Sequence, residues 1–218
     1  MDKKSIIKNF EELKKEAKER KFPQSVDLVV TLKDINLKKP EEQVEFFIAM
    51  PKPLAKKNKI CAIVAQDLEE EAKRVCDKVV LQSELAAYLK DKKAVRKLAE
   101  EYDFFIAQAN IMGQIAGAFG RVFGPRGKMP NPKAGCVVPP KTQLTPIYER
   151  LQNTIKLSAK KLPIFNAKVG TVETPAEEIA ENIMHIYDQI VHHLPKERHN
   201  VRGALMKLTM SKPKKLQI

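Results

Sequence analysis

The chain has 218 residues and carries 40 Lys plus Arg against 27 Asp plus Glu, which gives a formal net charge of +13. This charge indicates a polyanionic partner such as nucleic acid, with a solvated lysine-rich surface as the alternative. No apolar run approaches the ~18 residues of a membrane-spanning helix, and the N-terminal stretch has no apolar signal region. The three cysteines form no close pair, so we expect free thiols, a cytoplasmic location and no contact with a membrane.

The N-terminal part predicts one helix followed by two strands. Residues 1–20 place apolar side chains at helical spacing, and Phe22-Pro23 ends this helix. SVDLVVTLK (25–33) alternates polar and apolar residues, which is typical of a strand with one buried face. QVEFFIAM (43–50) repeats the alternation, and the length of the connection predicts that these two strands form an antiparallel pair.

The middle of the chain has a different pattern, in which strands alternate with helices. KICAIVA (59–65) and DFFIAQA (103–109) are almost continuously apolar, as strands covered on both faces are. A helix is expected after each of them, with Asp67 and Asn110 as the N-caps. The alternation predicts parallel βαβ units.

The C-terminal part returns to the first pattern. IKLSA (155–159) and IFNAKVG (164–170) are predicted strands, and Thr174-Pro175 begins a long amphipathic helix. RGALMKLTM (202–210) is a last alternating strand.

The predicted fold class is therefore α/β with two domains. Residues 1–53 and 155–218 form a discontinuous α+β domain, and residues 54–154 form an inserted three-layer, Rossmann-like βαβ domain. Because the chain crosses between them twice, we expect a double-stranded hinge that permits relative motion.

The stretch GRVFGPRGKMPNPKAG (120–135) gathers glycine, proline and cations in the middle domain. It is not a Walker loop, because Met129 follows Gly127-Lys128, and the glycine spacing does not fit a dinucleotide fingerprint. Glycine allows a close approach of backbone to phosphate, so the stretch predicts a contact with a phosphate backbone; the alternative is a hinge or crossover loop that packs against the other domain. The candidate residues of this stretch are Gly124, Arg126, Gly127, Lys128 and Lys133.

The sequence shows no catalytic or metal-binding pattern. His185 and His192 could share a helix face, but no Cys or carboxylate completes a zinc set near them. We therefore expect no catalysis, no metal and no cofactor. The rival hypothesis is an enzyme whose inserted α/β domain binds a nucleotide at the switch point of its sheet.

At GRVFGPRGKMPNPKAG (120–135) the chain closely resembles the signature of the large-subunit ribosomal protein one family. KFPQSVDLVVTLK (21–33) resembles the first strand of that family, and LTM (208–210) resembles its Thr-Met-Gly element. The forms of DFFIAQA and GPRGKMP are similar to the archaeal and eukaryotic branch. The resemblance covers about the whole chain.

The resemblance implies a structural, non-catalytic constituent of the large ribosomal subunit. Such a protein binds large-subunit rRNA at the mobile stalk near the exit site. It is expected to contact exit-site tRNA and other ribosomal components and to aid the release of deacylated tRNA. The discontinuous domain is expected to bind the rRNA, and the middle domain to add contacts with rRNA and tRNA. The family also implies repression of translation through the protein's own mRNA, and a monomer when free. A third hypothesis is that the protein acts off the ribosome as a regulator of mRNA. The sequence does not separate this hypothesis from the first, because one surface can bind both rRNA and mRNA.

The RNA-contacting residues implied by the resemblance come from both chain ends. The carried-over positions are Lys21, Phe22, Ser25, Asp27, Thr209, Met210 and Ser211, and the family has Gly where this chain has Ser211.

Ser25 and Asp27 also lie on the polar face of the first predicted strand, where a hydroxyl and a carboxylate can bond ribose 2′-hydroxyls or a base amine. Phe22 is either an RNA contact or a core residue that packs the first helix on the sheet. Further candidates, each of which could also be a solvated charge, are Lys33, Lys161 and Lys168.

Overall fold

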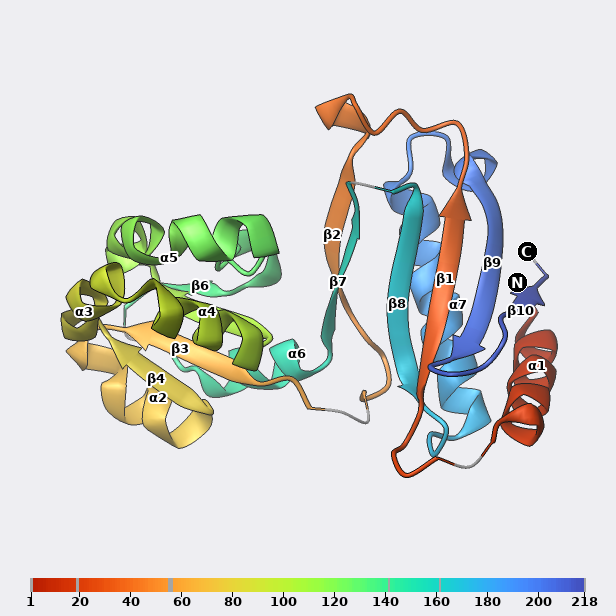
Figure 1. Cartoon of the computed structure of the whole chain (residues 1–218), viewed down its shortest axis with the longest axis horizontal. Coiled ribbons are helices and arrows are strands. Elements are labelled where there is room, and N and C mark those ends of the chain that lie inside the picture. Colours follow the sequence, from red (N-terminus) through yellow and green to blue (C-terminus); the bar gives the residue numbers. More distant parts are fainter. Residues whose placement is uncertain (1, 19, 55–56, 141, 161, 218) are drawn as a thin grey trace. The chain divides into compact units, whose positions relative to one another are not determined.

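The computed structural model describes the whole chain except residues 1, 19, 55–56, 141, 161 and 218 (Figure 1). The chain forms two compact units. One consists of Met1–Lys56 and Asn153–Ile218 and is called the terminal unit here; the other, Lys57–Gln152, is called the middle unit.

The terminal unit is built on a four-stranded antiparallel sheet of order β10-β9-β1-β8. β1 (Ser25–Leu32) lies between β8 (Ile164–Thr171) and β9 (Val201–Leu208), and β10 (Lys214–Leu216) extends the sheet beyond β9 (Figure 1). The strand nearest the N-terminus is therefore paired on both sides by strands from the C-terminal third of the chain.

Two helices cover one face of this sheet. Every second residue of β1 is buried, as the alternation predicts, and the buried residues join one core with α1 (Lys3–Glu16) and α7 (Ala176–His193). Asp2 caps α1 by accepting a hydrogen bond from the Lys4 backbone N–H. The alternate residues of β1, from Ser25 to Thr31, are half-buried on the opposite face.

The predicted pairing of the first two strands is wrong. β2 (Val44–Ala49) pairs with β7 (Thr154–Ala159) in a separate two-stranded antiparallel sheet. Both edges of β1 are already occupied by β8 and β9, so no ladder is left for β2. An alternating pattern shows which face of a strand is buried and does not select its partner.

The middle unit contains a parallel sheet of order β4-β3-β5-β6, which confirms the predicted parallel arrangement. Its strands are β3 (Ile60–Val64), β4 (Lys78–Leu81), β5 (Phe104–Gln108) and β6 (Val137–Val138). Every residue of β3 is buried, as expected for a strand covered on both faces.

Helices connect these strands. They are α2 (Glu69–Val75), α3 (Leu85–Lys90), α4 (Lys92–Glu101), α5 (Met112–Arg126) and α6 (Thr145–Gln152). The connection from β3 to β4 runs in one direction along the sheet and the later ones run in the other. With right-handed crossovers, α2 lies on one face, while α3, α4 and α5 lie on the opposite face. The core on the α5 side contains Phe105, Phe119 and Phe123; the ring centroid of Phe123 lies 4.3 Å from that of Phe105 and 5.0 Å from that of Phe119.

Short 3-10 segments occur at several turns. Asp67 and Asn110 lie inside the segments η2 (Gln66–Leu68) and η4 (Ala109–Ile111), which follow β3 and β5 directly, so neither residue is the N-cap that the sequence predicts. The other segments are η1 (Pro40–Glu42), η3 (Gln82–Glu84), η5 (Pro132–Ala134) and η6 (Glu197–Asn200). Of the helices in the described parts of the chain, none has the length and apolar character needed to cross a membrane.

Asn182 of α7 fixes the place where the chain leaves the terminal unit. Its side chain is fully buried, donates to the Val169 carbonyl oxygen (3.0 Å) and accepts from the Lys52 backbone N–H (3.2 Å).

We expect Asn182→Ala to lower the free energy of unfolding by about 1–3 kcal/mol, because two buried backbone groups lose their partner. Urea denaturation measures this change, with Asp188→Ala on the exposed side of α7 as the control. Equal losses in the two variants would contradict the assigned role of Asn182.

Candidate nucleic-acid interface

Hydrogen bonds join the start of β1 to the turn that follows β9. The Ser25 backbone N–H donates to Thr209 Oγ1 (3.0 Å), and the Thr209 backbone N–H donates to the Ser25 carbonyl oxygen (3.1 Å). The Met210 backbone N–H donates to Gln24 Oε1 (3.2 Å). The structure thus brings together the residues from the two chain ends that the resemblance places in one site.

Gln24 is the centre of this arrangement. Its residue is only 6% exposed, its Nε2 donates to the Lys18 carbonyl oxygen (3.3 Å), and its own carbonyl oxygen accepts from the Val172 backbone N–H (3.0 Å). Through its side-chain amide and its backbone carbonyl, this one buried residue therefore links the segment after α1, the turn after β8 and the turn after β9. Nothing in the periodicity of the sequence marks Gln24, because its partners come from three separate segments.

The serine at position 211 closes the turn after β9. Its Oγ accepts from the Leu208 backbone N–H (2.9 Å) and donates to the Lys212 carbonyl oxygen (3.2 Å), while the Ser211 backbone N–H donates to the Leu208 carbonyl oxygen (3.2 Å). The hydroxyl, which a glycine at position 211 would lack, is therefore used inside the turn.

Two large apolar side chains are exposed at this end of the sheet. Phe22 is 48% exposed and Met210 is 62% exposed, so the reading of Phe22 as a core residue is wrong. Of the described residues, Leu89 and Leu162 are the other large apolar residues exposed to this degree. An exposed apolar surface beside backbone polar groups is typical of a binding site.

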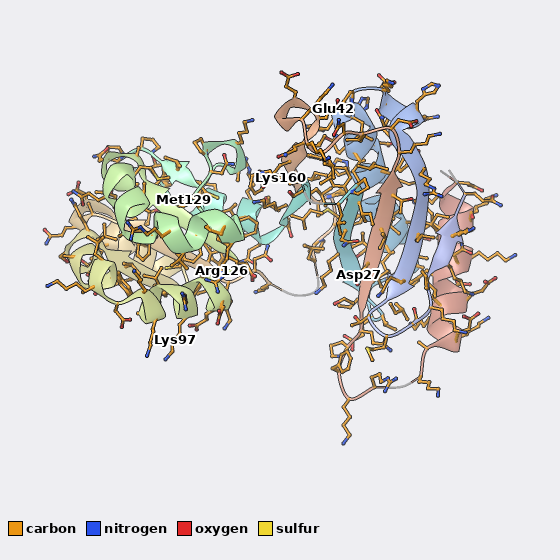
Figure 2. The ribbon with its side chains drawn as sticks, turned by 45° about the horizontal axis from the view of Figure 1, so that its top comes forward. Asp27, Glu42, Lys97, Arg126, Met129 and Lys160 are labelled. Carbon is orange, nitrogen blue, oxygen red and sulfur yellow. The ribbon has the colours of Figure 1, made fainter. Side chains whose placement is uncertain are left out.

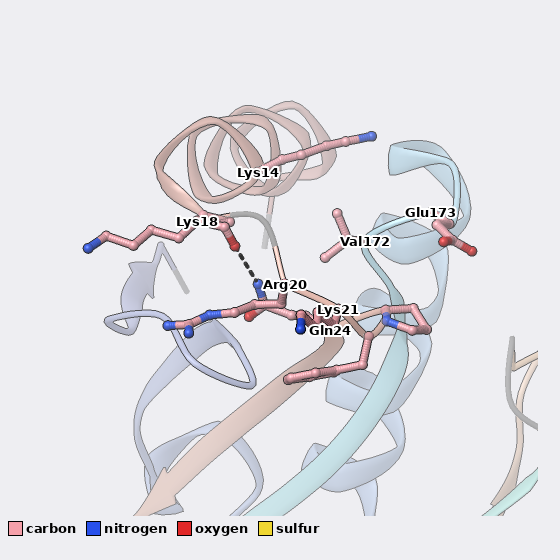
Figure 3. A pocket seen from close by; sticks show the side chains of 10 residues that line it. Lys14, Lys18, Arg20, Lys21, Gln24, Val172 and Glu173 are labelled. Carbon is pink, nitrogen blue, oxygen red and sulfur yellow. Dashed lines mark hydrogen bonds between the residues drawn. The ribbon is translucent and has the colours of Figure 1, made fainter.

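A basic hollow of about 570 Å³ lies beside Phe22, between the end of α1 and the turn after β8. Four of its lining residues are the cations Lys14, Lys18, Arg20 and Lys21, and Glu173 is the one carboxylate among the described residues that line it. Figure 3 shows Lys18 and Arg20 extending toward the same side of the hollow, and the dashed line marks the bond from Gln24 to the Lys18 carbonyl oxygen. Of these four cations, only Lys21 was predicted from the sequence as an RNA contact. The basic run at residues 14–21 is the sequence feature that could have indicated the other three.

Asp27 lies on β1 two residues after Ser25, on the sheet face opposite the helices (Figure 2). The strand register places it between Lys168 on β8 and Lys207 on β9. Burial raises the pKa of the Asp27 carboxyl above its usual range, and the charges of Lys207 and then Lys168 partly oppose this shift. Lys168 thus lies beside another candidate, and Lys207 is a neighbour that only the strand register reveals.

Two candidates are not part of this cluster. Lys33 follows the far end of β1, eight residues or about 26 Å along the strand from Ser25, where it lines a separate hollow with Lys196 and His199. Lys161 lies outside the residues that the structure describes.

The glycine-rich stretch of the middle unit is helical over its first half. α5 continues to Arg126, and Gly127 ends it in the left-handed conformation (φ 62°), which favours glycine. Gly124 therefore lies in a helix and not in a loop, and a Cβ added there would meet open space.

Two cations of this stretch bond within the middle unit. Arg126 pairs with Glu100 of α4 (2.9 Å), and Lys128 Nζ donates to the Tyr102 carbonyl oxygen (2.6 Å). Burial lowers the pKa of the Lys128 ammonium from its usual value. These bonds fix the C-terminal end of α5 against that of α4, whereas Lys133 remains exposed.

The hollow at the carboxyl ends of β3 and β4 does not fit the nucleotide that the rival hypothesis needs. Its lining includes Gln66, Asp67, Gln82, Ser83 and Gln114, and no Lys or Arg is among the described residues that line it. A carboxylate without a cation is a poor environment for phosphates. Within the described ranges, no group of three or more His, Cys, Asp or Glu side chains could hold a metal ion.

The raised pKa of Asp27 predicts a dependence of stability on pH. A carboxyl with a higher pKa in the folded state destabilises the fold once it is ionised, so its unfavourable effect is absent below the unfolded-state pKa and develops as pH rises through the folded-state value. We expect Asp27→Asn to be more stable than the parent protein at pH 7, and the difference to shrink toward pH 4. Urea denaturation at both pH values measures this, with Asp188→Asn as the control; a less stable Asp27→Asn variant at pH 7 would show that the lysines outweigh burial.

Comparison with known proteins gives one consistent result. The family model described as "Ribosomal protein L1p/L10e family" matches residues 13–212. Three archaeal proteins named large ribosomal subunit protein uL1 are similar over nearly their full length. That of Methanothermococcus thermolithotrophicus is 38% identical over 217 residues (100% of both chains), that of Pyrococcus horikoshii 38% over 210 residues (96% of this chain, 94% of the relative), and that of Methanocaldococcus jannaschii 33% over 210 residues (96% and 94%).

These matches confirm the resemblance found at residues 120–135, including its archaeal character. They also confirm the expectation that the chain is not an enzyme, since the family is a ribosomal one. A model match over 13–212 and relatives that align end to end leave one conclusion: the chain belongs to the ribosomal protein L1p/L10e family.

Proposed function

We propose that the protein is a constituent of the large ribosomal subunit that binds rRNA at the end of the terminal-unit sheet where β1 begins and β9 ends. The observation that carries this proposal is the set of hydrogen bonds by which Gln24 and Ser25 hold Thr209 and Met210 beside exposed Phe22. The names of the curated relatives supply the ribosomal setting.

The chemistry of this surface suits RNA. The cations of the hollow can neutralise phosphates, and exposed Phe22 and Met210 can pack on bases or riboses that are not stacked. Asp27 repels phosphate but accepts hydrogen bonds from ribose 2′-hydroxyls, which DNA lacks. Its half-buried position between Lys168 and Lys207 fits a role in recognition.

Membership of the family supports a proposal of finer roles. The rRNA segment is that of the mobile stalk near the exit site, exit-site tRNA is a further partner, and release of deacylated tRNA is the step the protein assists. An mRNA that presents the same shape would bind the same surface, and in that way the protein would repress its own translation.

We also propose that the two units are domains joined by a double-stranded hinge. The chain passes from one unit to the other near residue 56 and returns near residue 153. Within the terminal unit the two passages start from neighbouring positions, because Ala49 pairs with Thr154 and the Met50 backbone N–H donates to the Asn153 carbonyl oxygen (2.8 Å).

That proximity makes the domain proposal testable. A chain that lacks residues 54–152, with Pro53 joined to Asn153 by a short Gly-Ser linker, should fold cooperatively and still bind rRNA specifically, with lower affinity. Circular dichroism and filter binding measure the two properties. A folded remnant that does not bind rRNA would contradict the assignment of the main site to the terminal unit.

The site itself is tested by removing its apolar side chains. We expect Phe22→Ala with Met210→Ala to weaken binding to deproteinised large-subunit rRNA of M. thermolithotrophicus by at least the roughly 1–3 kcal/mol of one base stacked on Phe22. Stability should change little, because both residues are exposed.

Leu162→Ala is the matched control, because Leu162 is an equally exposed apolar residue of the same unit. An unchanged affinity of the double variant would remove both residues from the interface. The proposed function would be overturned altogether if the parent protein bound the rRNA no more tightly than it binds an unrelated RNA hairpin.

A further inference from the structure

The start of α4 carries the densest group of cations in the middle unit. Within residues 90–97 the chain has five basic side chains and one acid, Asp91. All five cations are exposed, and none forms an ion pair with another residue that the structure describes; they are Lys90, Lys92, Lys93, Arg96 and Lys97. Figure 2 shows Lys97 at the edge of the unit with its side chain directed away from the ribbon.

These charges lie where they destabilise their own helix. The N-terminal end of a helix carries a partial positive charge, which favours acids in the first turn and bases in the last. α4 has the reverse order: it begins with Lys92 and Lys93, has no acid in the first turn, and ends with Glu100 and Glu101. Asp91 offsets this only in part, by accepting from the Lys93 and Ala94 backbone N–H groups (2.9 and 3.1 Å).

Repulsion between neighbouring turns adds to this effect. Lys92 and Arg96 are four residues apart, as are Lys93 and Lys97, and like charges at this spacing destabilise a helix by a few tenths of a kcal/mol for each pair. The fold supplies the opposing stability from the other side of α4, where Val95, Leu98 and Ala99 are buried in the core.

A merely solvated lysine surface does not account for this arrangement. Two lysines of other helices have carboxylate partners: Lys73 pairs with Glu69 one turn away, and Lys3 of α1 pairs with Glu181 (3.0 Å). α4 instead places four cations on two successive turns of one face with no carboxylate between them. The charges would repel one another less if an anion lay across them.

We infer that the exposed face of α4 binds the phosphate backbone of an RNA helix, as a second contact surface on the middle unit; the inference rests on the proposed rRNA-binding function. The paired cations repeat at one turn of the helix, about 5.4 Å, which is comparable to the separation of successive phosphates along a strand. The buried face holds α4 in place, so these cations lie in fixed rows, and their contact is with phosphates and independent of base sequence.

The test replaces Lys92, Lys93 and Lys97 together by Gln, which has a similar helix propensity. Affinity for deproteinised large-subunit rRNA of M. thermolithotrophicus is measured with the full chain from 50 to 300 mM KCl. Loss of three phosphate contacts should weaken binding at 50 mM about ten-fold or more and make the slope of log K against log salt shallower by about 2 to 3. The melting temperature should stay the same or rise, because the unfavourable charges are gone.

The matched control is Lys57→Gln with Lys59→Gln and Arg74→Gln. It removes the same charge from exposed positions of the same unit, at the amino end of β3 and the end of α2. Because parallel strands place α2 and α4 with their C-terminal ends toward the amino edge of the sheet, these residues lie away from the start of α4. The control should keep nearly the parental slope.

An α4 variant with the parental affinity and slope would overturn the inference, and so would an equal loss in the control, which would assign the effect to net charge. An acidic protein segment as the partner of α4 would also give unchanged RNA binding. The proposed function fails separately, because it predicts a large loss of specific binding in the Phe22→Ala, Met210→Ala variant whether or not α4 contributes.

Discussion

The fold and its candidate site depend on the pairing of β1 with two strands from the far end of the chain. β8 and β9 occupy both edges of β1, and the bonds between Ser25 and Thr209 extend the β9 ladder past the end of the regular strand. The buried side chain of Gln24 then adds the turn at Met210 and the segment at Lys18 to the same structure. None of these surfaces exists in either chain end alone.

The site combines groups of opposite preference within a small area. Cations gather around the hollow near Phe22, while a half-buried carboxylate lies between two lysines on the adjoining sheet face. A surface built only for phosphate would not include Asp27, and one built only for stability would not expose Phe22 and Met210. The combination is explained by a ligand that presents phosphates, hydroxyl donors and unstacked rings together, as folded RNA does.

Periodicity in the sequence predicted the elements well, because burial on one face or on both leaves a direct trace in the order of residues. Val26, Leu28 and Val30 are buried as predicted, and so is the whole of β3. The pairing of the strands was harder to predict from the sequence: β2 has a clear alternation, but its partner β7 lies more than a hundred residues away. β10 was missed because three residues, two of them lysines, are too few to show a period.

Residues of the candidate site could be predicted from the sequence only where the family resemblance assigns a role to the matching position. Phe22 and Met210 were named in this way, and the structure shows them exposed at one end of the sheet. Gln24 and Lys207 were not named, since the role of the first depends on three tertiary partners and that of the second on strand register. In the glycine-rich stretch, the sequence showed the cations Arg126 and Lys128. It did not show that Arg126 pairs with Glu100 at the end of α4 or that Lys128 donates to the Tyr102 carbonyl oxygen.

The central position of β1 has a consequence for synthesis. As the chain emerges from the ribosome, β1 appears early, but the strands that complete its sheet begin at residues 164 and 201. At elongation rates of about 5–20 residues per second, β1 stays without β9 for roughly 10 to 35 seconds, while the strands and helices of Lys57–Gln152 are made and can fold. The amino end of each new molecule therefore has an unprotected apolar strand until translation is nearly finished, and it is a natural target for a nascent-chain chaperone.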